Sequence, residues 1–566
     1  MKLNSLIAAM SVAGIAPVMA WASFGAVAET PAADGQAISR AIEPAAAAML
    51  ADTQSPKVRI SGGAWVVAGQ SHSLTGWVSD DVAVSKVVWH NTRTGLIGSA
   101  TLSGAGTVAS WTIGKIPVVA GANLIYVAAF DAAGNKTRIE TTITANATTS
   151  DGTVGPCAGF YPAGFQLAQG KLVQPWATTP QPQRGIATRG YNYGTCQMRL
   201  TDRAADGLPG YARNDYSRKQ PFNADDSAQL IAAGDGSWHL YEPATGRYIR
   251  SLSYLPGGDG LAGDAEPQWD PLNRDLLYYM NSEGVGMLLR KIDVKTGVRS
   301  VQANFAARLK ARWPTAASAS TAAEGSPSAD GRYWCLMVKN SAGSRLGIFT
   351  WDKTEDRILG MADHTGHIDN VSMSPSGNYC VVNVPYVGTT VWPRDLSSSR
   401  QITNDGQHSD MAIDKNGDDV YVSNYLRISD PVLKDGDVYM YNLRTGQKTT
   451  LFSSYLNGTT TAMHFSGRAF AKPGWVVMGT QAEGCARTSC SQQWAHRKIM
   501  VVELAANPRI YNIADTRVSY VDYDSAPVPA VNRSLTKIAW NSNWGRSAAS
   551  TETYNVQIPS YAIPER

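Results

Sequence analysis

A short segment that recurs seven times in the last two-thirds of the chain limits what this sequence can fold into. Each copy supplies turn-forming residues and is followed by an apolar run of strand length. Successive copies lie roughly 40–65 residues apart, a spacing typical of repeat architectures. Seven such repeats predict a seven-bladed β-propeller, in which four-stranded sheets stand radially around a channel. The copies begin at Pro221, Pro267, Ser326, Ser372, Met411, Arg468 and Pro527.

The fourth repeat shows the expected order of strands most clearly. Its inner strand is expected over His367–Ser374, and a Pro-Ser-Gly-Asn turn follows. The fifth repeat starts at His408 and has the same order, with its turn at Asp414–Gly417. Near the start of the ring, Tyr193–Leu200 is expected to complete the last blade and so hide its open edge. The other strands expected in the fourth repeat are Tyr379–Val384, Gly388–Pro393 and Arg400–Thr403.

The N-terminus has the pattern of a secretory signal over residues 1–28. Lys2 provides the positive start, Leu6–Ala20 the apolar stretch, and Ala26-Val-Ala28 the cleavage site. An uncleaved anchor is the alternative, and no later segment is apolar for long enough to span a membrane. We therefore expect a periplasmic or secreted protein, in which an Ala-rich flexible leader occupies residues 29–54.

Residues 55–146 form a separate unit in this interpretation. Six short apolar or alternating runs, separated by tight turns, predict a β-sandwich. Residues 147–190 are rich in Thr, Gln and Pro and are expected to be a linker, and residues 191–566 then form the propeller. The expected fold class is all-β. The six runs are Lys57–Ile60, Ser73–Trp77, Lys86–Asn91, Val108–Ile113, Asn123–Phe130 and Arg138–Thr144.

Two known groups of proteins are similar to parts of the chain. The pieces Gly76–Asp81 and Asp131–Asn135, with the strands after and before them, resemble bacterial immunoglobulin-like modules. The Ser-Pro-x-Gly turns resemble those of TolB-type propellers. Within that group, Gly366–Pro375 resembles the secreted oligogalacturonate-lyase-like propellers. That resemblance implies a polysaccharide lyase with a divalent metal, such as Mn, Ca or Zn, held by His and Gln in the central funnel. The chain lacks the closely spaced His-x-His pair of the pectin-cleaving members.

Polar residues at the starts of the inner strands are expected to crowd one mouth of the channel. Three of the eight His residues, His367, His408 and His464, fall at equivalent places in consecutive repeats. Imidazoles can hold a divalent cation or act as acid and base near neutral pH. Arg218 and Lys219 lie at the same level of the first repeat. The further residues expected to bind substrate at this mouth are Glu266, Gln268, Glu324, Asp369, Asp410 and Arg468.

These residue types suit β-elimination at a uronic acid, where a cation neutralises the carboxylate and a base removes the neighbouring proton. His367, His408 and His464 are the candidate bases or metal ligands, and Arg218 and Lys219 are the candidate neutralising cations. The expected partner is a polysaccharide or oligosaccharide. Two alternatives stay open. The imidazoles can serve only to bond neighbouring sheets in a glycan- or protein-binding propeller, or Glu266 and Glu324 can act as a hydrolytic pair.

Composition and motifs exclude several other classes. The net charge of +4 with no run of Lys or Arg argues against a nucleic-acid partner. A P-loop and a Gly-x-Ser-x-Gly motif are both absent, which disfavours nucleotide hydrolysis and the α/β-hydrolase class. Export makes disulfides possible among the six cysteines. The candidate pairs are Cys485–Cys490, Cys157–Cys196 and Cys335–Cys380, and the last two cysteines are alternatively buried thiols.

Overall fold

The computed structural model describes most of the chain after residue 51. The predicted signal peptide, nearly all of the predicted leader and the cysteines at 485 and 490 lie outside the described residues. Among the described residues, no helix is long and apolar enough to cross a bilayer. The described residues are 52–60, 66–67, 71–104, 106–119, 121–146, 153, 155–176, 178–253, 260–385, 387–454, 461–481, 492–519 and 522–565.

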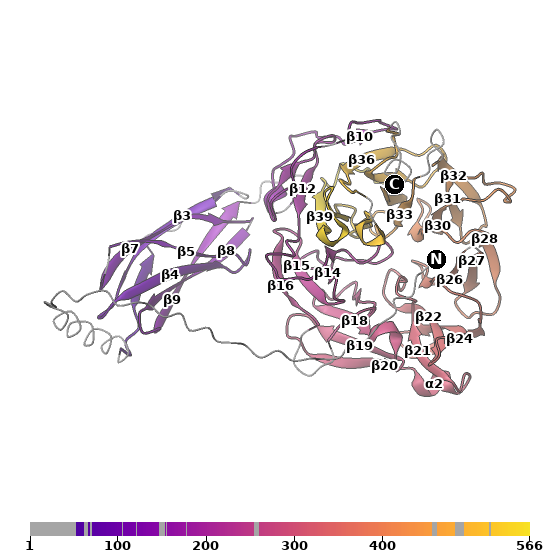
Figure 1. Cartoon of the computed structure of the whole chain (residues 1–566), viewed down its shortest axis with the longest axis horizontal. Helices are drawn as coiled ribbons and strands as arrows, with labels where there is room; N and C mark the ends of the chain where they lie inside the picture. Colours follow the sequence, from indigo (N-terminus) through magenta and orange to yellow (C-terminus); the bar gives the residue numbers. More distant parts are fainter. Residues whose placement is uncertain are drawn as a thin grey trace, which may run out of the picture.

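The N-terminal part contains two β-sheets, of four and five strands, that lie beside a ring of further sheets (Figure 1). Strand β7 alternates buried and exposed residues, so that Ala109, Trp111 and Ile113 enter a shared core with Leu74 and Val127. All six expected strands are present with similar bounds. The first sheet contains β1 (Lys57–Ile60), β3 (Ser71–Ser79), β7 (Val108–Pro117) and β6 (Thr101–Ser103). The second contains β2 (Val66–Val67), β9 (Lys136–Asn146), β8 (Gly121–Asp131), β4 (Val84–Asn91) and β5 (Ile97–Ser99).

Four consecutive antiparallel sheets of four strands make up half of the ring (Figure 1). They are β17 (Gln268–Trp269), β18 (Leu276–Met280), β19 (Leu288–Asp293) and β20 (Arg299–Asn304); β21 (Ala316–Ser320), β22 (Tyr333–Asn340), β23 (Arg345–Asp352) and β24 (Arg357–Asp363); β25 (Asn370–Met373), β26 (Tyr379–Val384), β27 (Gly388–Pro393) and β28 (Arg400–Thr403); β29 (Ser409–Ile413), β30 (Asp419–Asn424), β31 (Asp437–Asn442) and β32 (Lys448–Ser453).

Two larger sheets complete the ring. One has the order β10 (Ala168–Gln169), β36 (Ile510–Asp515), β35 (Lys498–Glu503), β34 (Trp475–Thr480) and β33 (Met463–Ser466). The other has nine strands. They are β11 (Thr188–Arg189), β12 (Cys196–Arg199), β39 (Glu552–Gln557), β13 (Ala212–Arg213), β14 (Gln229–Ala233), β15 (Trp238–Glu242) and β16 (Arg247–Ser251), with β37 (Ala530–Val531) and β38 (Lys537–Ser542) joined through β39.

The chain ends meet in the nine-stranded sheet. Cys196 lies opposite Gln557 and Arg199 opposite Tyr554, so the segment expected over Tyr193–Leu200 does pair with the last strand. The region expected to be a linker also contributes strands, because β10 pairs with β36 and β11 with β12. Helical pieces are short: α2 (Ala306–Lys310), η1 (Gly155–Cys157), η2 (Ser282–Gly284), η3 (Tyr523–Ser525) and η4 (Ala548–Ser550).

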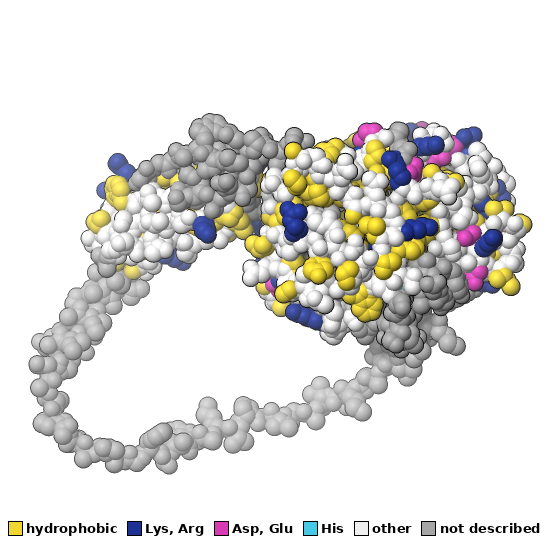
Figure 2. Space-filling model, turned by 90° about the horizontal axis from the view of Figure 1, so that it is seen from above, with side chains coloured by type: hydrophobic (Ala, Val, Ile, Leu, Met, Phe, Trp, Pro, Cys, Tyr) yellow, Lys and Arg dark blue, Asp and Glu magenta, His cyan; other side chains and the backbone are white. Residues whose placement is uncertain are grey.

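Neighbouring sheets of the ring pack through apolar side chains from both. Val422 of β30 and Met478 of β34 share one core cluster, for example. The turn before β26 places Gly377 at φ +75°, where a side chain would be strained. Two disulfides add covalent links. Cys335–Cys380 joins β22 to β26, and Cys157–Cys196 joins η1 to β12, as two of the candidate pairings expected. Figure 2 shows one face on which Lys and Arg side chains are dispersed among uncharged ones.

Candidate functional site

The innermost strands bring residues from distant parts of the chain to one mouth of the ring, called here the head mouth. His408 directly precedes β29 and His464 lies in β33. Their rings stack with centroids 4.2 Å apart and planes 23° from parallel. Repeats that are 56 residues apart in sequence therefore meet side by side, as the alignment of repeats predicted for these two imidazoles.

Arg218 occupies the centre of the head mouth and is 2% exposed. It follows β13, yet its guanidinium donates to the Ser409 carbonyl of another sheet and forms an ion pair with Glu324 of a third. Its own carbonyl accepts a hydrogen bond of 2.7 Å from the Ser326 hydroxyl. The segment carrying Arg218 thus fills the middle of the ring and ties several sheets together.

The other two predicted cations are also paired with carboxylates. Lys219 forms an ion pair with Asp215, four residues earlier. Arg468 donates to both oxygens of Asp410, at 2.6 and 3.2 Å, and both side chains are buried. The backbone N–H of Gly467 donates to the same carboxylate. Arg468 and Asp410 therefore hold two neighbouring sheets together, and neither is placed to contact a substrate at the head mouth.

Glu266 and Gln268 support the loop over residues 321–325. The Glu266 carboxylate accepts from the N–H and hydroxyl of Thr321 and from the N–H of Ala323, at 2.6–2.8 Å. Burial raises the pKa of Glu266, against the field of Lys219. Gln268 donates to the Gly325 carbonyl at 2.9 Å. The structure does not support Glu266 and Glu324 as a hydrolytic pair, because the Glu266 carboxylate is occupied by its hydrogen bonds from Thr321 and Ala323.

Glu324 lies in a different element from the one expected. Its sheet begins at β21, which ends at Ser320, so Glu324 belongs to the loop that follows the innermost strand. Its side chain is 24% exposed beside Arg218. Burial raises the pKa of Glu324, and Arg218 opposes that effect while Asp369 adds to it.

The two stacked imidazoles differ in their hydrogen bonds. Nδ1 of His408 lies 3.1 Å from the Met463 carbonyl oxygen. A carbonyl can only accept, so Nδ1 carries the proton and Nε2 keeps its lone pair. Burial, with a contribution from Arg218, lowers the pKa of His408 to about 4. His464 is 1% exposed, its pKa is lowered by burial and by His408, and neither ring nitrogen has a partner among the described residues.

Two tyrosines complete this site and were not predicted. The Tyr216 and Tyr523 rings contact His464 edge to face, with centroids 5.7 and 6.3 Å away. Tyr523 is 44% exposed, and burial of its hydroxyl together with Glu324 raises its pKa. Tyr216 lies two residues before Arg218. Tyr523, in η3, lies four residues before the copy that starts at Pro527, as His464 does before Arg468, so the position in the repeat was the available signal for both tyrosines. The mouth cluster is defined as Tyr216, Arg218, Glu324, His408, His464 and Tyr523.

His367 lies apart from the other two imidazoles. It is exposed, and its Nδ1 lies 2.9 Å from Nη2 of Arg345. His367, Arg345 and Asp369 line a pocket of about 170 Å³ that also includes Glu266. Asp369 contributes to the field on both Arg218 and His408, so this pocket borders the mouth cluster.

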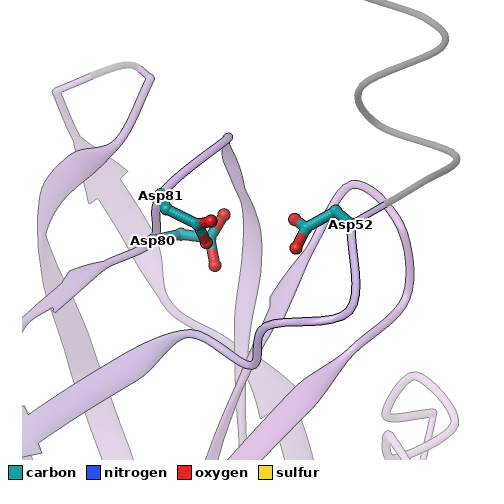
Figure 3. A group of neighbouring side chains, drawn as sticks. All are labelled: Asp52, Asp80 and Asp81. Atoms are coloured by element: carbon teal, nitrogen blue, oxygen red, sulfur yellow. The ribbon is translucent and has the colours of Figure 1, made fainter.

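The three imidazoles do not fit a metal that all of them would hold. Nδ1 of His408 is engaged with a carbonyl, and a guanidinium faces His367. Within the described part of the chain, one set of three acidic or imidazole side chains lies close enough together to hold a metal ion. It consists of Asp52, Asp80 and Asp81 (Figure 3). That group lies in the N-terminal unit, and part of it bonds Gln54 and nearby backbone. No chemical step below therefore uses a metal.

No protein-family model and no curated protein matches the chain. Solved structures are similar at low identity. An oligogalacturonate lyase in complex with manganese has 14% identity and a TM-score of 0.47, covering 70% of this chain and 98% of that one. An oligogalacturonate lyase from Vibrio parahaemolyticus has 12% identity and a TM-score of 0.46, covering 66% and 96%. The Pan2 WD40 domain of Neurospora crassa has 11% identity and a TM-score of 0.40, covering 66% and 98%.

Proposed function

We propose that this protein cleaves an acidic polysaccharide by β-elimination at the head mouth, with His408 as the base. The observation that carries the proposal is the hydrogen bond between Nδ1 of His408 and the Met463 carbonyl. It leaves Nε2 as a fixed proton acceptor, and the lowered pKa keeps this imidazole neutral at pH 7. The half-buried position of His408 leaves it open to a ligand from the mouth.

The remaining groups match what elimination requires. His408 removes the proton from the ring carbon next to the uronate carboxylate, and the freed electron pair forms a carbon–carbon double bond. The bond from the adjacent carbon to the glycosidic oxygen then breaks, and that oxygen takes a proton from the Tyr523 hydroxyl. The raised pKa of Tyr523 keeps it protonated until this step. Proton exchange with water restores both side chains, and no water is consumed in the cleavage.

Arg345 is our candidate for neutralising the substrate carboxylate, in place of Arg218 and Lys219. Among the described residues it has no carboxylate ion pair, and its Nε is buried without a hydrogen bond. It lines the pocket that borders the mouth cluster together with His367 and Asp369. A uronate carboxylate bound there would provide the negatively charged partner that the Arg345 guanidinium lacks among the described residues.

A non-catalytic glycan-binding protein is the second candidate, and one observation favours it. Arg218, Lys219 and Arg468 are each already paired with a carboxylate, so these predicted cations serve the architecture. Binding without cleavage would then use the exposed Tyr523 and His367 as contact residues.

We infer the finer architecture in the same way. Dividing the nine-stranded sheet at the single parallel pair, Ala212 with Glu552, gives seven radial sheets and hence a seven-bladed propeller over residues 191–566. The two N-terminal sheets are proposed as an immunoglobulin-like module over residues 55–146. Two disulfides are compatible with an extracytoplasmic protein, and we propose export through the signal peptide at residues 1–28.

The test is a screen of uronate polymers for unsaturated product by ultraviolet absorbance, with and without chelator. We expect activity on at least one polymer, no loss in the chelator, and a loss of about 100-fold or more in kcat for His408→Gln. His90→Gln, in the N-terminal unit, is the matched control and should retain activity.

Two results would contradict this assignment. Polymer binding with no unsaturated product would establish the non-catalytic alternative. Cleavage that persists unchanged in His408→Gln, or that chelator abolishes, would show that another group or a metal performs the chemistry.

A further inference from the structure

A second pocket of about 280 Å³ lies beside the start of β35 and the end of β36. Its walls come from four separate segments. They are Trp176 and Thr178 between β10 and β11, Gln492 and Arg497 before β35, Asp515 at the end of β36 with Arg517, Val518 and Ser519 after it, and Gly545 after β38. No residue of the mouth cluster lines it. The start of β35 lies beside the end of β36 here, so the pocket is at the open end of the β35–β36 hairpin.

The pocket carries more positive than negative charge. Arg497 and Arg517 both line it, and the Nε of each is buried without a hydrogen-bond partner among the described residues. Neither guanidinium has a carboxylate ion pair within that described part, unlike Arg218 or Arg468. Burial lowers the pKa of both Arg497 and Arg517, and Asp515 opposes that effect for Arg517.

The one acid of the pocket, Asp515, offsets only part of this charge. Both oxygens of Asp515 accept hydrogen bonds from the Asn192 amide, at 2.9 and 3.0 Å. Burial raises the pKa of Asp515, which weakens its charge further. The two guanidiniums therefore outnumber the single acid, and an anionic ligand would find unmet donors there.

Aromatic rings flank both guanidiniums. Arg497 lies 3.6 Å from the centroid of the Trp176 ring, and Trp176 remains 43% exposed. Arg517 lies 5.2 Å from the Trp544 ring. An exposed indole beside a cation suits a ligand that combines an apolar ring face with an anionic group.

The backbone at this pocket is strained in three places. Arg497 and Arg517 adopt φ of +54°, and Trp544 adopts +52°, although none is glycine. Such conformations are unfavourable for residues that carry a side chain, and they concentrate at functional sites. Here they fix the two guanidiniums and the indole of Trp544.

We propose that this pocket is a binding site for a sugar acid, whose carboxylate lies between Arg497 and Arg517 while its ring packs on Trp176. The volume of about 280 Å³ suits one sugar residue rather than a long chain. Gln492 and Ser519 supply polar contacts to ring hydroxyls. The site holds whether or not the head mouth is catalytic, because the two share no residue.

Titration calorimetry on the full-length protein tests the proposal with four small probes: D-galacturonate, its methyl ester, D-galactose and inorganic phosphate. We expect galacturonate to bind, and the uncharged ester and galactose to bind at least about tenfold more weakly. Arg497→Gln and Arg517→Gln should each weaken galacturonate binding by about tenfold or more, since each removes a charge-assisted contact. Equal binding of acid and ester, or binding of phosphate alone, would overturn the sugar-acid assignment.

Arg509→Gln is the matched control, because Arg509 lies at the opposite end of the same hairpin, where it pairs with Glu503. It lowers the net charge equally and should bind galacturonate like the wild type. His408→Gln should also leave this binding intact, which separates failure here from failure of the proposed catalysis. If Arg517→Gln proves unstable by thermal unfolding, Arg497→Gln alone decides: unchanged affinity in that variant contradicts the proposal.

Discussion

Two imidazoles stacked at the head mouth illustrate how strongly burial controls protonation at the level of single residues. Burial lowers the pKa of His464 well below 6.5, and it lowers that of His408 to about 4. Both are neutral in the folded protein at pH 5–6, whereas the unfolded chain protonates them there. The unfolded state then binds more protons, so the free energy of unfolding falls as the pH drops from about 6.5 towards 4.

His464→Leu tests this linkage, because it removes the fully buried imidazole of the pair and fills the space with an apolar side chain. Between about pH 4 and 6.5 the dependence of the unfolding free energy on pH should become shallower, by at most about 1.4 kcal/mol per pH unit. Urea denaturation at four pH values measures it. Tyr216→Phe, which changes a neighbour that does not titrate in this range, should keep the wild-type slope. An unchanged slope in His464→Leu would refute the buried neutral imidazole.

At the scale of elements, the segment between β13 and β14 connects several sheets of the ring through its side chains and does not act as a catalytic loop. It was predicted at the channel mouth, and it does carry Arg218 and Lys219 there. The sequence alone could not show that Glu324, Asp215 and the Ser409 carbonyl would neutralise and bury these cations. Glu324 and Ser409 lie 106 and 191 residues from Arg218, and side-chain pairing over such separations depends on the finished ring.

Arg218→Met should destabilise the protein by about 3–5 kcal/mol, because it leaves the Ser409 carbonyl and the Glu324 carboxylate without their buried partner. Chemical denaturation followed by tryptophan fluorescence measures the change. The matched control is Arg274→Met, which breaks an ion pair with Asp225 whose arginine is 57% exposed, and it should cost less than about 1 kcal/mol. Similar losses in the two variants would contradict a central structural role for Arg218.

Some elements were predictable from sequence and others were not, for physical reasons. Strands β26, β27 and β28 match the expected bounds because apolar, β-branched runs between Gly and Pro turns specify them locally. Strand β21 was missed because Ala316–Ser320 contains only Ala and Ser, which carry little strand signal. Pairing with β22 makes Ala316–Ser320 the innermost strand of its sheet. Glu324 therefore lies in the loop after that strand and not at its start.

At the scale of the whole molecule, the ring depends on a few strands near its two ends. Strand β39 pairs with β38, β12 and β13, so it connects the last sheet both to the returning N-terminal strand and to the next sheet. Strand β12 is itself enclosed between β11 and β39. A ring closed in this way hides edges that would otherwise pair with other chains, and it makes distant sheets unfold together.

Met198→Pro tests this closure, because Leu200 donates to the Thr553 carbonyl and the alternating ladder turns the Met198 N–H towards β39 as well. A proline there removes that donor and should cost about 3 kcal/mol or more. Hydrogen exchange should then increase in β38, β39 and β14 as well as in β12. Gln169→Pro is the matched control: Gly170 donates to the Ile510 carbonyl at 2.8 Å, so the alternating ladder turns the Gln169 N–H away from β36. That variant should keep wild-type protection throughout the ring. If Met198→Pro loosens β12 alone while β39 and β14 stay protected, the sheets are stable independently and closure by the N-terminal strand is not what holds the ring together.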